Sequence, residues 1–255
     1  MKKIIIANWK MNPASTFEAE KLFSVVKKYA AGRKFDLIIA PSFVHLGVLA
    51  RRHGPIKLAA QDIFYGASSG AVGAYTGEVS GQMLKNCGAS HVIVGHSERR
   101  INFGESEEII HKKLMASFFS SLKPILCVGE RERSPGGFSE IIREEISSAL
   151  RGIPKRFASR LLLAYEPIWA ISTTKGAKAD TPQNVFETTI FIRRIVLDIW
   201  GKFAALKVPV LYGGSVNSKN VAQFLSVKGI NGLLVGGASL DIKEFSKILN
   251  EAKRL

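Results

Sequence analysis

Eight short apolar runs, separated by stretches with helical spacing, are the feature that most constrains the fold of this chain. The runs are IIIAN (4–8), FDLIIAP (35–41), IKLAAQ (56–61), SHVIVGH (90–96), PILCVGE (124–130), LLLAYE (161–166), PVLYGG (209–214) and GLLVGG (232–237). Between them, segments such as 105–122 and 139–153 place apolar residues three and four apart, which is typical of amphipathic helices. The sequence therefore predicts eight strands that alternate with eight helices.

Strands that read as continuous apolar runs are buried on both faces, as in a parallel sheet covered by helices. Eight strand-helix units in 255 residues fit a closed (β/α)8 barrel better than an open doubly wound sheet. No Pro-, Gly- or Ser-rich linker divides the chain, so we expect an α/β protein with one barrel domain over residues 1–255.

The formal charge of +15 is the unusual feature of the composition. A basic surplus can attract nucleic acid, an anionic surface or small anionic substrates. Here the basic residues form scattered pairs, without a basic tail or an aromatic-interleaved stripe, so we expect no nucleic-acid partner. The longest nearly apolar segment, 160–171, is interrupted by Glu166 and falls well short of the roughly 20 residues of a membrane span. We therefore expect no membrane partner either.

The opening MKKIIIANWK is basic, but its apolar stretch ends at Asn8, before it reaches the about 7 to 15 residues of a secretory signal. A cytoplasmic location is the expectation. Cys87 and Cys127 lack metal-ligand spacing, and both are expected to be small buried residues in a reducing compartment.

In a barrel of this kind, the polar residues that end the strands gather at the C-terminal face. Applied to this chain, the rule selects ten residues: Asn8, Lys10, His96, Glu98, Glu166, Gly213, Gly214, Ser215, Gly236 and Gly237. We expect any chemistry to lie among them.

The two Gly-Gly pairs follow the last two strands and let backbone N–H groups approach an anion, so they favour a phosphate site. The alternative is that they only form tight turns. Lys10 would place an ammonium at the same mouth, where it could stabilise developing negative charge. Taken alone, it could equally be a solvated charge on the rim.

Glu166 ends an apolar strand, where partial desolvation strengthens a carboxylate as a proton acceptor. A structural salt bridge is the alternative role. His96 could donate a hydrogen bond to a carbonyl oxygen, or it could be a satisfied core residue. The five His residues are dispersed, so no metal site is expected. The combination of a base, a neutral electrophile, an ammonium group and a phosphate site indicates proton transfer next to a carbonyl. The substrate would be a small phosphorylated sugar, and the intermediate would be an enediolate.

Seven motifs spread along the chain resemble the triosephosphate isomerase family. They are ANWKMN (7–12), GAYTGEVS (73–80), VGHSERR (94–100), CVGE (127–130), AYEPIWAI (164–171), YGGSV (212–216) and LLVGGASL (233–240). They stand in the family's order from end to end. This family gives its name to the TIM barrel and is the familiar example of a Glu base paired with a neutral His.

The resemblance implies interconversion of dihydroxyacetone phosphate and D-glyceraldehyde 3-phosphate, without a cofactor or metal. By the family's pattern, Glu166 moves the proton and His96 polarises the carbonyl. Lys10 and Asn8 would bind and stabilise the anionic intermediate, and Glu98 would lie behind Lys10 as its partner.

The same pattern assigns a phosphate site and a subunit interface. The phosphate-binding residues would be Gly214, Ser215, Gly236 and Gly237, joined by the backbone of Ser172 when the lid closes. Members of the family are mostly homodimers, so we expect a homodimer here. The long loop over residues 62–79 would place Thr76 near Asn12 of the partner subunit.

The chain also departs from the family pattern. Its lid reads AISTTK where AIGTGK is usual, and a positive φ at Ser172 would cost about 1 to 2 kcal/mol. Thr174 is β-branched and stiffer still. Asp62 stands where Asn is common. Asn231 stands where the family often carries an Asp that pairs with Arg193, so a neutral hydrogen bond is expected to replace that ion pair.

Two rival functions remain open at this point. A Schiff-base aldolase on the same barrel would use Lys10 as its nucleophile, which requires a Lys desolvated in an apolar pocket. A non-catalytic or lid-impaired homologue could instead bind phosphorylated ligands, or bind anions or nucleic acid through its charge. The residues Asn8, Lys10, His96 and Glu166 favour the isomerase over both.

Overall fold

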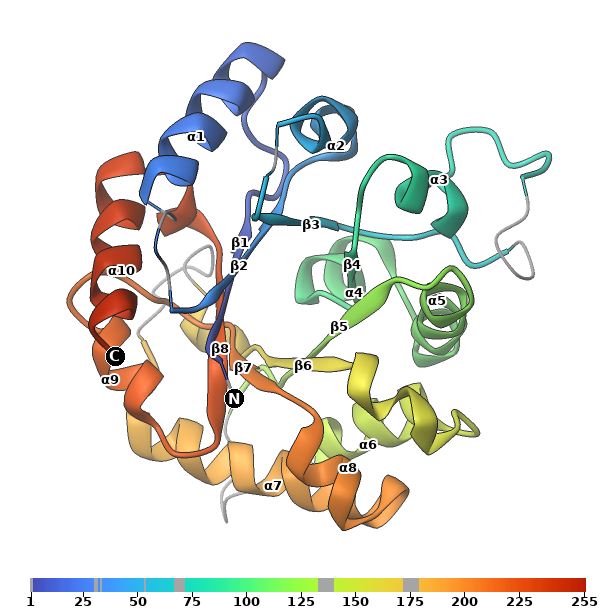
Figure 1. The fold of residues 1–255 in the computed structure, drawn as a ribbon. Coiled ribbons are helices and arrows are strands. Elements are labelled where there is room, and N and C mark those ends of the chain that lie inside the picture. The colour runs from blue at the N-terminus through green and yellow to red at the C-terminus, as the bar shows by residue number, and fades with distance from the viewer. Residues whose placement is uncertain are drawn as a thin grey trace.

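The strands form a closed parallel barrel in sequence order, with β8 beside β1 (Figure 1). The computed structural model describes residues 2–29, 32, 34–52, 54–66, 72–132, 140–171 and 179–255. The strands are β1 (Ile4–Asn8), β2 (Asp36–Ala40), β3 (Lys57–Ala60), β4 (His91–Val94), β5 (Lys123–Val128), β6 (Leu162–Tyr165), β7 (Val210–Tyr212) and β8 (Ile230–Val235). All eight lie within the predicted runs or one or two residues beyond them, so the prediction of a (β/α)8 TIM barrel is confirmed.

The described residues contain ten α-helices, so the prediction of eight is wrong. They are α1 (Thr16–Tyr29), α2 (Phe43–Ala50), α3 (Gly81–Asn86), α4 (Ser97–Phe103), α5 (Glu107–Phe119), α6 (Glu140–Leu150), α7 (Pro182–Trp200), α8 (Lys202–Lys207), α9 (Val221–Ser226) and α10 (Ile242–Arg254). The two additional helices, α4 and α8, have seven and six residues. Two turns of helix are too short to show a periodic apolar pattern.

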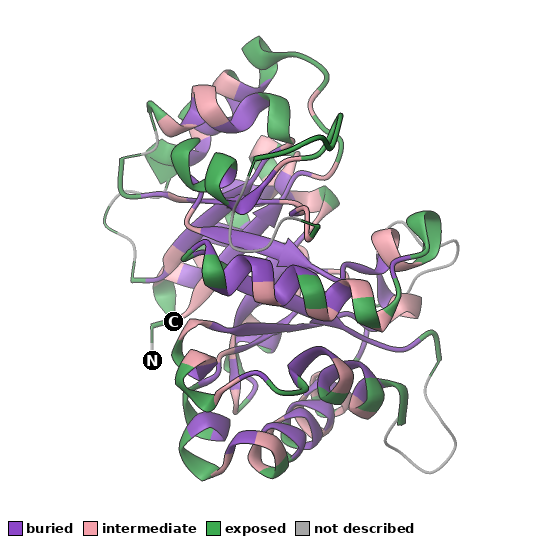
Figure 2. Ribbon diagram, turned by 90° about the vertical axis from the view of Figure 1, so that its right-hand side faces the viewer, coloured by how far each residue is buried: buried purple, intermediate pink, exposed green. Residues whose placement is uncertain are grey.

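Two apolar layers hold the barrel together. Because successive side chains of a strand point to opposite faces, Ile6 joins Ile38 and Ile93 in a cluster built of strand residues. Ile5 belongs to a second, larger cluster that includes helix residues such as Phe23. Figure 2 shows the result: the strands are mostly buried, and the helices are buried along one side only.

Glycine is required where β8 closes the barrel. A Cβ at Gly232 would lie 1.8 Å from the carbonyl oxygen of Ile4 on β1, a distance that no side chain tolerates. The two strands can pair in register only because this position has no side chain.

The two cysteines have different environments. Cys127 is buried among the strand residues of the inner cluster, as expected. Cys87 is exposed, so the expectation for this residue is wrong. It is the C-terminal cap of the short helix α3, where its backbone N–H bonds the helix carbonyls and its side chain is left at the surface. Within the described parts of the chain, no helix has the length and apolar content needed to cross a membrane.

Candidate active site

The residues predicted at the strand ends come together at one mouth of the barrel, as expected. Seven of the ten line one small cavity, whose described walls are Asn8, Lys10, His96, Glu166, Ile171, Gly213, Gly214, Leu234 and Gly236. These residues lie at or just beyond the C-terminal ends of β1, β4, β6, β7 and β8, where barrels of this class carry their chemistry.

Glu166 is buried and makes two polar contacts at this mouth. It follows the last residue of β6, and its backbone N–H donates to the carbonyl of Val128 on β5. Only 2 % of the residue is exposed. Its Oε2 accepts a hydrogen bond of 3.1 Å from the backbone N–H of Ser97, and its Oε1 lies 3.2 Å from Nε2 of His96. Among the described residues, no Lys or Arg pairs with this carboxylate, so the structure gives no support to a structural salt bridge.

His96 is the N-cap of α4, and this position determines its tautomer. Its Nδ1 accepts a hydrogen bond of 3.2 Å from the backbone N–H of Glu98. A neutral ring whose Nδ1 is an acceptor carries its proton on Nε2. That nitrogen faces Glu166 and the cavity. His96 is therefore arranged to donate a hydrogen bond into the site.

Lys10 has an unusual backbone that fixes its side chain at the mouth. Its φ is 52°, in the left-handed region where few residues other than Gly are found. Its N–H donates to Oδ1 of Asn8, and its carbonyl accepts hydrogen bonds from Oγ of Ser42 and Nε2 of Gln61. Backbone strain held by its surroundings in this way is common at functional sites.

The predicted partner of Lys10 is confirmed. Its Nζ lies 2.6 Å from Oε1 of Glu98. An ammonium paired with a carboxylate is a poor amine nucleophile. The pairing therefore argues against the Schiff-base aldolase.

The glycines after β7 are needed for close packing. A Cβ at Gly213 would lie 3.0 Å from Cγ of Glu166, and one at Gly214 would lie 2.2 Å from the hydroxyl of Tyr212. Gly213 thus lets the β7 loop pass directly beside the candidate base, and Gly214 lets it pass beside the Tyr212 side chain. After β8, Gly236 precedes a short 3-10 helix, η4 (Gly237–Ser239).

Ser215, a predicted phosphate-binding residue, makes a backbone hydrogen bond within the chain. Its backbone N–H donates a hydrogen bond of 2.7 Å to the carbonyl of Ala170, the last residue of the 3-10 helix η3 (Ile168–Ala170). This N–H is thus already engaged. Ser172 and Thr174, the lid positions, lie outside the described residues.

The two residues assigned to a subunit interface, Asn12 and Thr76, are both exposed at the surface of the chain. The single chain brings neither of them into the cavity. Within the described ranges, no cluster of three or more His, Cys, Asp or Glu side chains could hold a metal ion.

Several contacts at the site involve residues that the sequence did not single out. Ser97 and Gln61 hold Glu166 and Lys10, as described above. Gly129 packs so closely that a Cβ there would lie 1.9 Å from the backbone oxygen of Glu166. The N–H of Gly129 in turn donates to the buried Glu145 of α6. A glutamate on the apolar side of a helix is the sequence signal that could have identified Glu145.

Two departures from the family pattern have clear structural partners away from the cavity. Oδ1 of Asn231 accepts a hydrogen bond of 2.8 Å from Arg193, which confirms the expected neutral hydrogen bond. Asp62 pairs with Arg99 at 3.0 Å and with Lys113 at 2.6 Å. Burial raises the pKa of Asp62, and the nearby Lys113 opposes that rise.

Comparison with known proteins identifies relatives along nearly the whole chain. A profile of the family described as Triosephosphate isomerase matches residues 3–252. The Triosephosphate isomerase of Dictyoglomus turgidum is 41 % identical over 253 residues, which are 97 % of this chain and 98 % of that protein. The Triosephosphate isomerase of Aquifex aeolicus is also 41 % identical, over 98 % of this chain and 99 % of that protein.

Proposed function

The chain belongs to the triosephosphate isomerase family, and we propose that its barrel mouth interconverts dihydroxyacetone phosphate and D-glyceraldehyde 3-phosphate through an enediolate. The 3.2 Å separation between Oε1 of Glu166 and Nε2 of His96 is the observation that supports this most strongly. It places a proton acceptor and a hydrogen-bond donor at one cavity. Removal of a proton beside a carbonyl requires both.

In the proposed reaction, the Glu166 carboxylate takes a proton from the carbon next to the carbonyl. The electrons of the broken C–H bond form the C=C bond of the enediolate, and the carbonyl oxygen becomes negative. The Nε2–H of His96 donates a hydrogen bond to that oxygen, and the Lys10 ammonium stabilises the charge. The proton of the adjacent hydroxyl then moves to the former carbonyl oxygen, the oxygen that loses it becomes the new carbonyl oxygen, and Glu166 returns its proton to the former carbonyl carbon, so no atom is gained or lost.

The phosphate of the substrate is assigned to the glycine-rich loops after β7 and β8. Gly214, Gly236 and Gly237 leave backbone atoms accessible without side chains in the way. The N–H of Ser215 can join them only by releasing the carbonyl of Ala170, to which it now donates. Because Ala170 lies two residues before Ser172, phosphate binding would act directly on the segment that leads into the lid.

A homodimer in the cytoplasm is the proposed form of the enzyme, with residues 1–255 as one domain. A second cavity lies beside the catalytic one, and its walls include Met11, Phe43 and Phe103. Met11 is 91 % exposed and Phe103 is 68 % exposed. Apolar side chains clustered at the surface in this way mark interaction sites. A monomeric mass in sedimentation at micromolar concentration would argue against the dimer.

The test of the reaction is to add D-glyceraldehyde 3-phosphate to the purified protein in D2O and follow the products by NMR. Dihydroxyacetone phosphate should form far above the buffer rate, with deuterium at the exchanged carbon. The Glu166→Gln variant should lose this conversion, while the matched variant Glu144→Gln, which changes an exposed carboxylate, should keep it.

Three outcomes of this experiment separate the alternatives. Conversion with little methylglyoxal supports the proposal in full. Conversion with abundant methylglyoxal indicates a lid-impaired isomerase, because the enediolate then loses phosphate to solvent before it is protonated. Conversion no faster than in buffer would refute the proposal and support a non-catalytic homologue.

A further inference from the structure

A cavity of about 590 Å³ lies on the side of the barrel away from the catalytic mouth. One wall is the 3-10 helix η2 (Lys155–Arg160), which precedes β6, and the other is α8, which precedes β7. Because the strands are parallel, segments that precede them lie at their N-terminal ends, opposite the catalytic residues. The volume is in the usual range for a small-molecule site.

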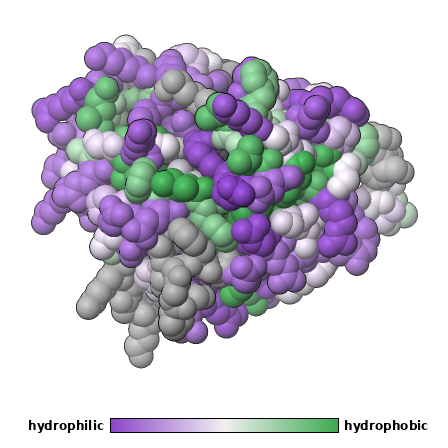
Figure 3. All heavy atoms as spheres, turned by 90° about the horizontal axis from the view of Figure 1, so that it is seen from below, coloured by the Kyte–Doolittle hydropathy of each residue, from purple (hydrophilic) through white to green (hydrophobic). Residues whose placement is uncertain are grey.

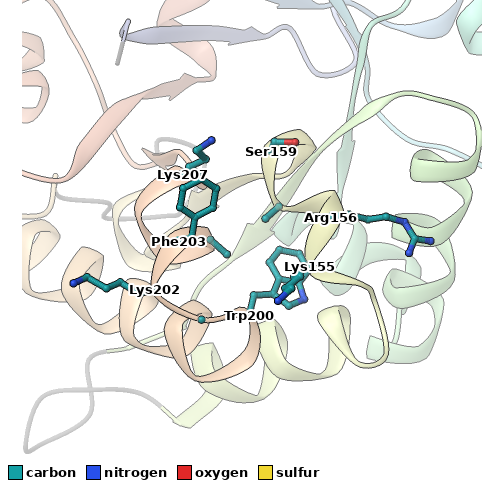
Figure 4. Close-up of a pocket in the computed structure, with 10 residues that line it drawn as sticks. Lys155, Arg156, Ser159, Trp200, Lys202, Phe203 and Lys207 are labelled. Carbon is teal, nitrogen blue, oxygen red and sulfur yellow. The ribbon is translucent and has the colours of Figure 1, made fainter.

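The floor and one wall of this cavity are aromatic. Trp200, the last residue of α7, is buried, and its indole N–H is satisfied by the carbonyl of Ile153 at 2.8 Å. Phe203 on α8 is 72 % exposed and faces the cavity. Figure 4 shows its ring beside α8, above and to the left of Trp200. A flat apolar group could lie against this ring at little cost, because neither aromatic side chain has an unsatisfied polar atom to bury.

The charged residues that line the cavity are all basic. Lys155, Arg156, Lys202 and Lys207 line it, and its described walls contain no carboxylate. None of these four cations forms an ion pair with a described residue. Nζ of Lys207 lies 4.2 Å from the centroid of the Phe203 ring. Arg156 and Lys202 point outward to opposite sides in Figure 4, so they contribute to the local field rather than to direct contacts.

The surface around the cavity also combines apolar and hydrophilic side chains. Figure 3, seen from below Figure 1, shows hydrophobic patches enclosed by hydrophilic side chains on the side of the molecule where α7 and α8 lie. An apolar surface whose charged lining residues are all cations is complementary to a molecule that combines a flat apolar ring with negative charge. Neither a neutral ring nor a simple anion would use both halves of the cavity.

We propose that this cavity is a second ligand site, which binds an aromatic anion of the nucleotide class. The base would lie against Phe203 above Trp200, and the phosphates would meet the ammonium groups of Lys207 and Lys155. Stacking of a base on an aromatic side chain and pairing of phosphate with lysine are both well-established modes of nucleotide binding. The site is separate from the catalytic mouth and takes no part in the isomerase reaction.

Calorimetric titration of the intact protein with ATP at low ionic strength tests this proposal. Adenosine and inorganic phosphate serve as the two half-ligands, and each should bind at least tenfold more weakly than ATP. Phe203→Ser should weaken ATP binding by about tenfold or more, because it removes the stacking surface. Lys207→Gln should weaken it by a smaller factor that disappears at high salt.

Matched controls are available on other helices. Phe119→Ser changes an exposed Phe of α5, and Lys85→Gln changes an exposed Lys of α3. Both variants should bind ATP like the unmodified protein. Isomerase activity should be unchanged in all four variants and should not be inhibited competitively by ATP.

Four results would overturn the proposal: ATP binding that survives Phe203→Ser, ATP that competes with the triose phosphate, phosphate that binds as tightly as ATP, or an oligonucleotide that binds far more tightly than ATP. The second would place ATP in the catalytic phosphate site. The third would indicate a general anion effect, and the fourth would indicate a nucleic-acid surface.

Discussion

Replacing Glu145 with glutamine tests how a buried carboxyl behind the active site depends on pH. Glu145 lies on α6 with 7 % of its surface exposed. Its Oε2 accepts the N–H of Gly129 at 2.8 Å, and its Oε1 lies 3.3 Å from Nη1 of Arg100. Glutamine has nearly the same shape and keeps an oxygen for the Gly129 N–H, but it does not titrate. The variant therefore isolates the ionisation of this one group.

The magnitude follows from the pKa of the buried group. Burial raises the pKa of Glu145 from 4.5 to about 7, and the charges of Glu107 and Glu166 add to the rise. Arg100 and the N–H of Gly129 oppose it. A folded-state pKa above the unfolded one means that the stabilisation is fully present below about pH 4.5 and is lost as the pH rises through about 7. The difference in pKa corresponds to roughly 3 kcal/mol.

The free energy of unfolding of Glu145→Gln, relative to the unmodified protein, should therefore increase by up to about 3 kcal/mol between pH 4.5 and pH 8. Urea titrations at one fixed protein concentration measure it. Glu144→Gln, at the exposed neighbouring position, is the control and should show no such change. A difference that stays constant with pH, or one that favours the unmodified protein as the pH rises, would refute the reasoning.

Three further predictions concern the site and its surroundings. Gly213→Ala should lower kcat by about tenfold to a hundredfold, because its Cβ would displace the base by contact at 3.0 Å; an unchanged kcat would contradict this. Asn231→Asp should raise the free energy of unfolding by about 1 kcal/mol, because its hydrogen bond to Arg193 becomes an ion pair; a lower melting temperature would argue against it. Ser172→Gly combined with Thr174→Gly should ease lid closure and lower the fraction of methylglyoxal; unchanged turnover and products would show that the lid substitutions are neutral.

The strands could be predicted from the sequence because each is a continuous apolar run. A strand that is buried on both faces is apolar at successive positions, and the lengths of the apolar runs matched those of the strands to within a few residues. The helices were harder to predict from the sequence. α1 and α5 have more than three turns and show apolar spacing, whereas α4 and α8 are too short to do so. The number of helices was therefore underestimated at these two short helices.

The candidate site was predictable as a set of residue types but not as a set of contacts. The rule that strand ends meet at one face was enough to bring Glu166, His96 and Lys10 together. The groups that hold them could not be found in this way. The N–H of Ser97 is 69 residues from Glu166 in the chain, and the Gln61 amide is 51 residues from Lys10. Every residue except Pro has a backbone N–H, so the residue type does not mark the donor. No short motif spans such separations.

The start of α4 explains both why this helix was missed and why it matters. Helices usually begin at Ser, Thr, Asp or Asn, whose side chains accept the first unpaired N–H groups. Here His96 accepts the N–H of Glu98, and Glu166, which follows β6, accepts the N–H of Ser97. The first backbone N–H groups of any helix need acceptors from outside the helix. Here two of them orient the candidate electrophile, His96, and the candidate base, Glu166. The usual preference for Ser, Thr, Asp or Asn at a helix start is not followed here, because the residues that accept these N–H groups belong to the candidate site. Exceptions to local sequence rules are expected at functional sites.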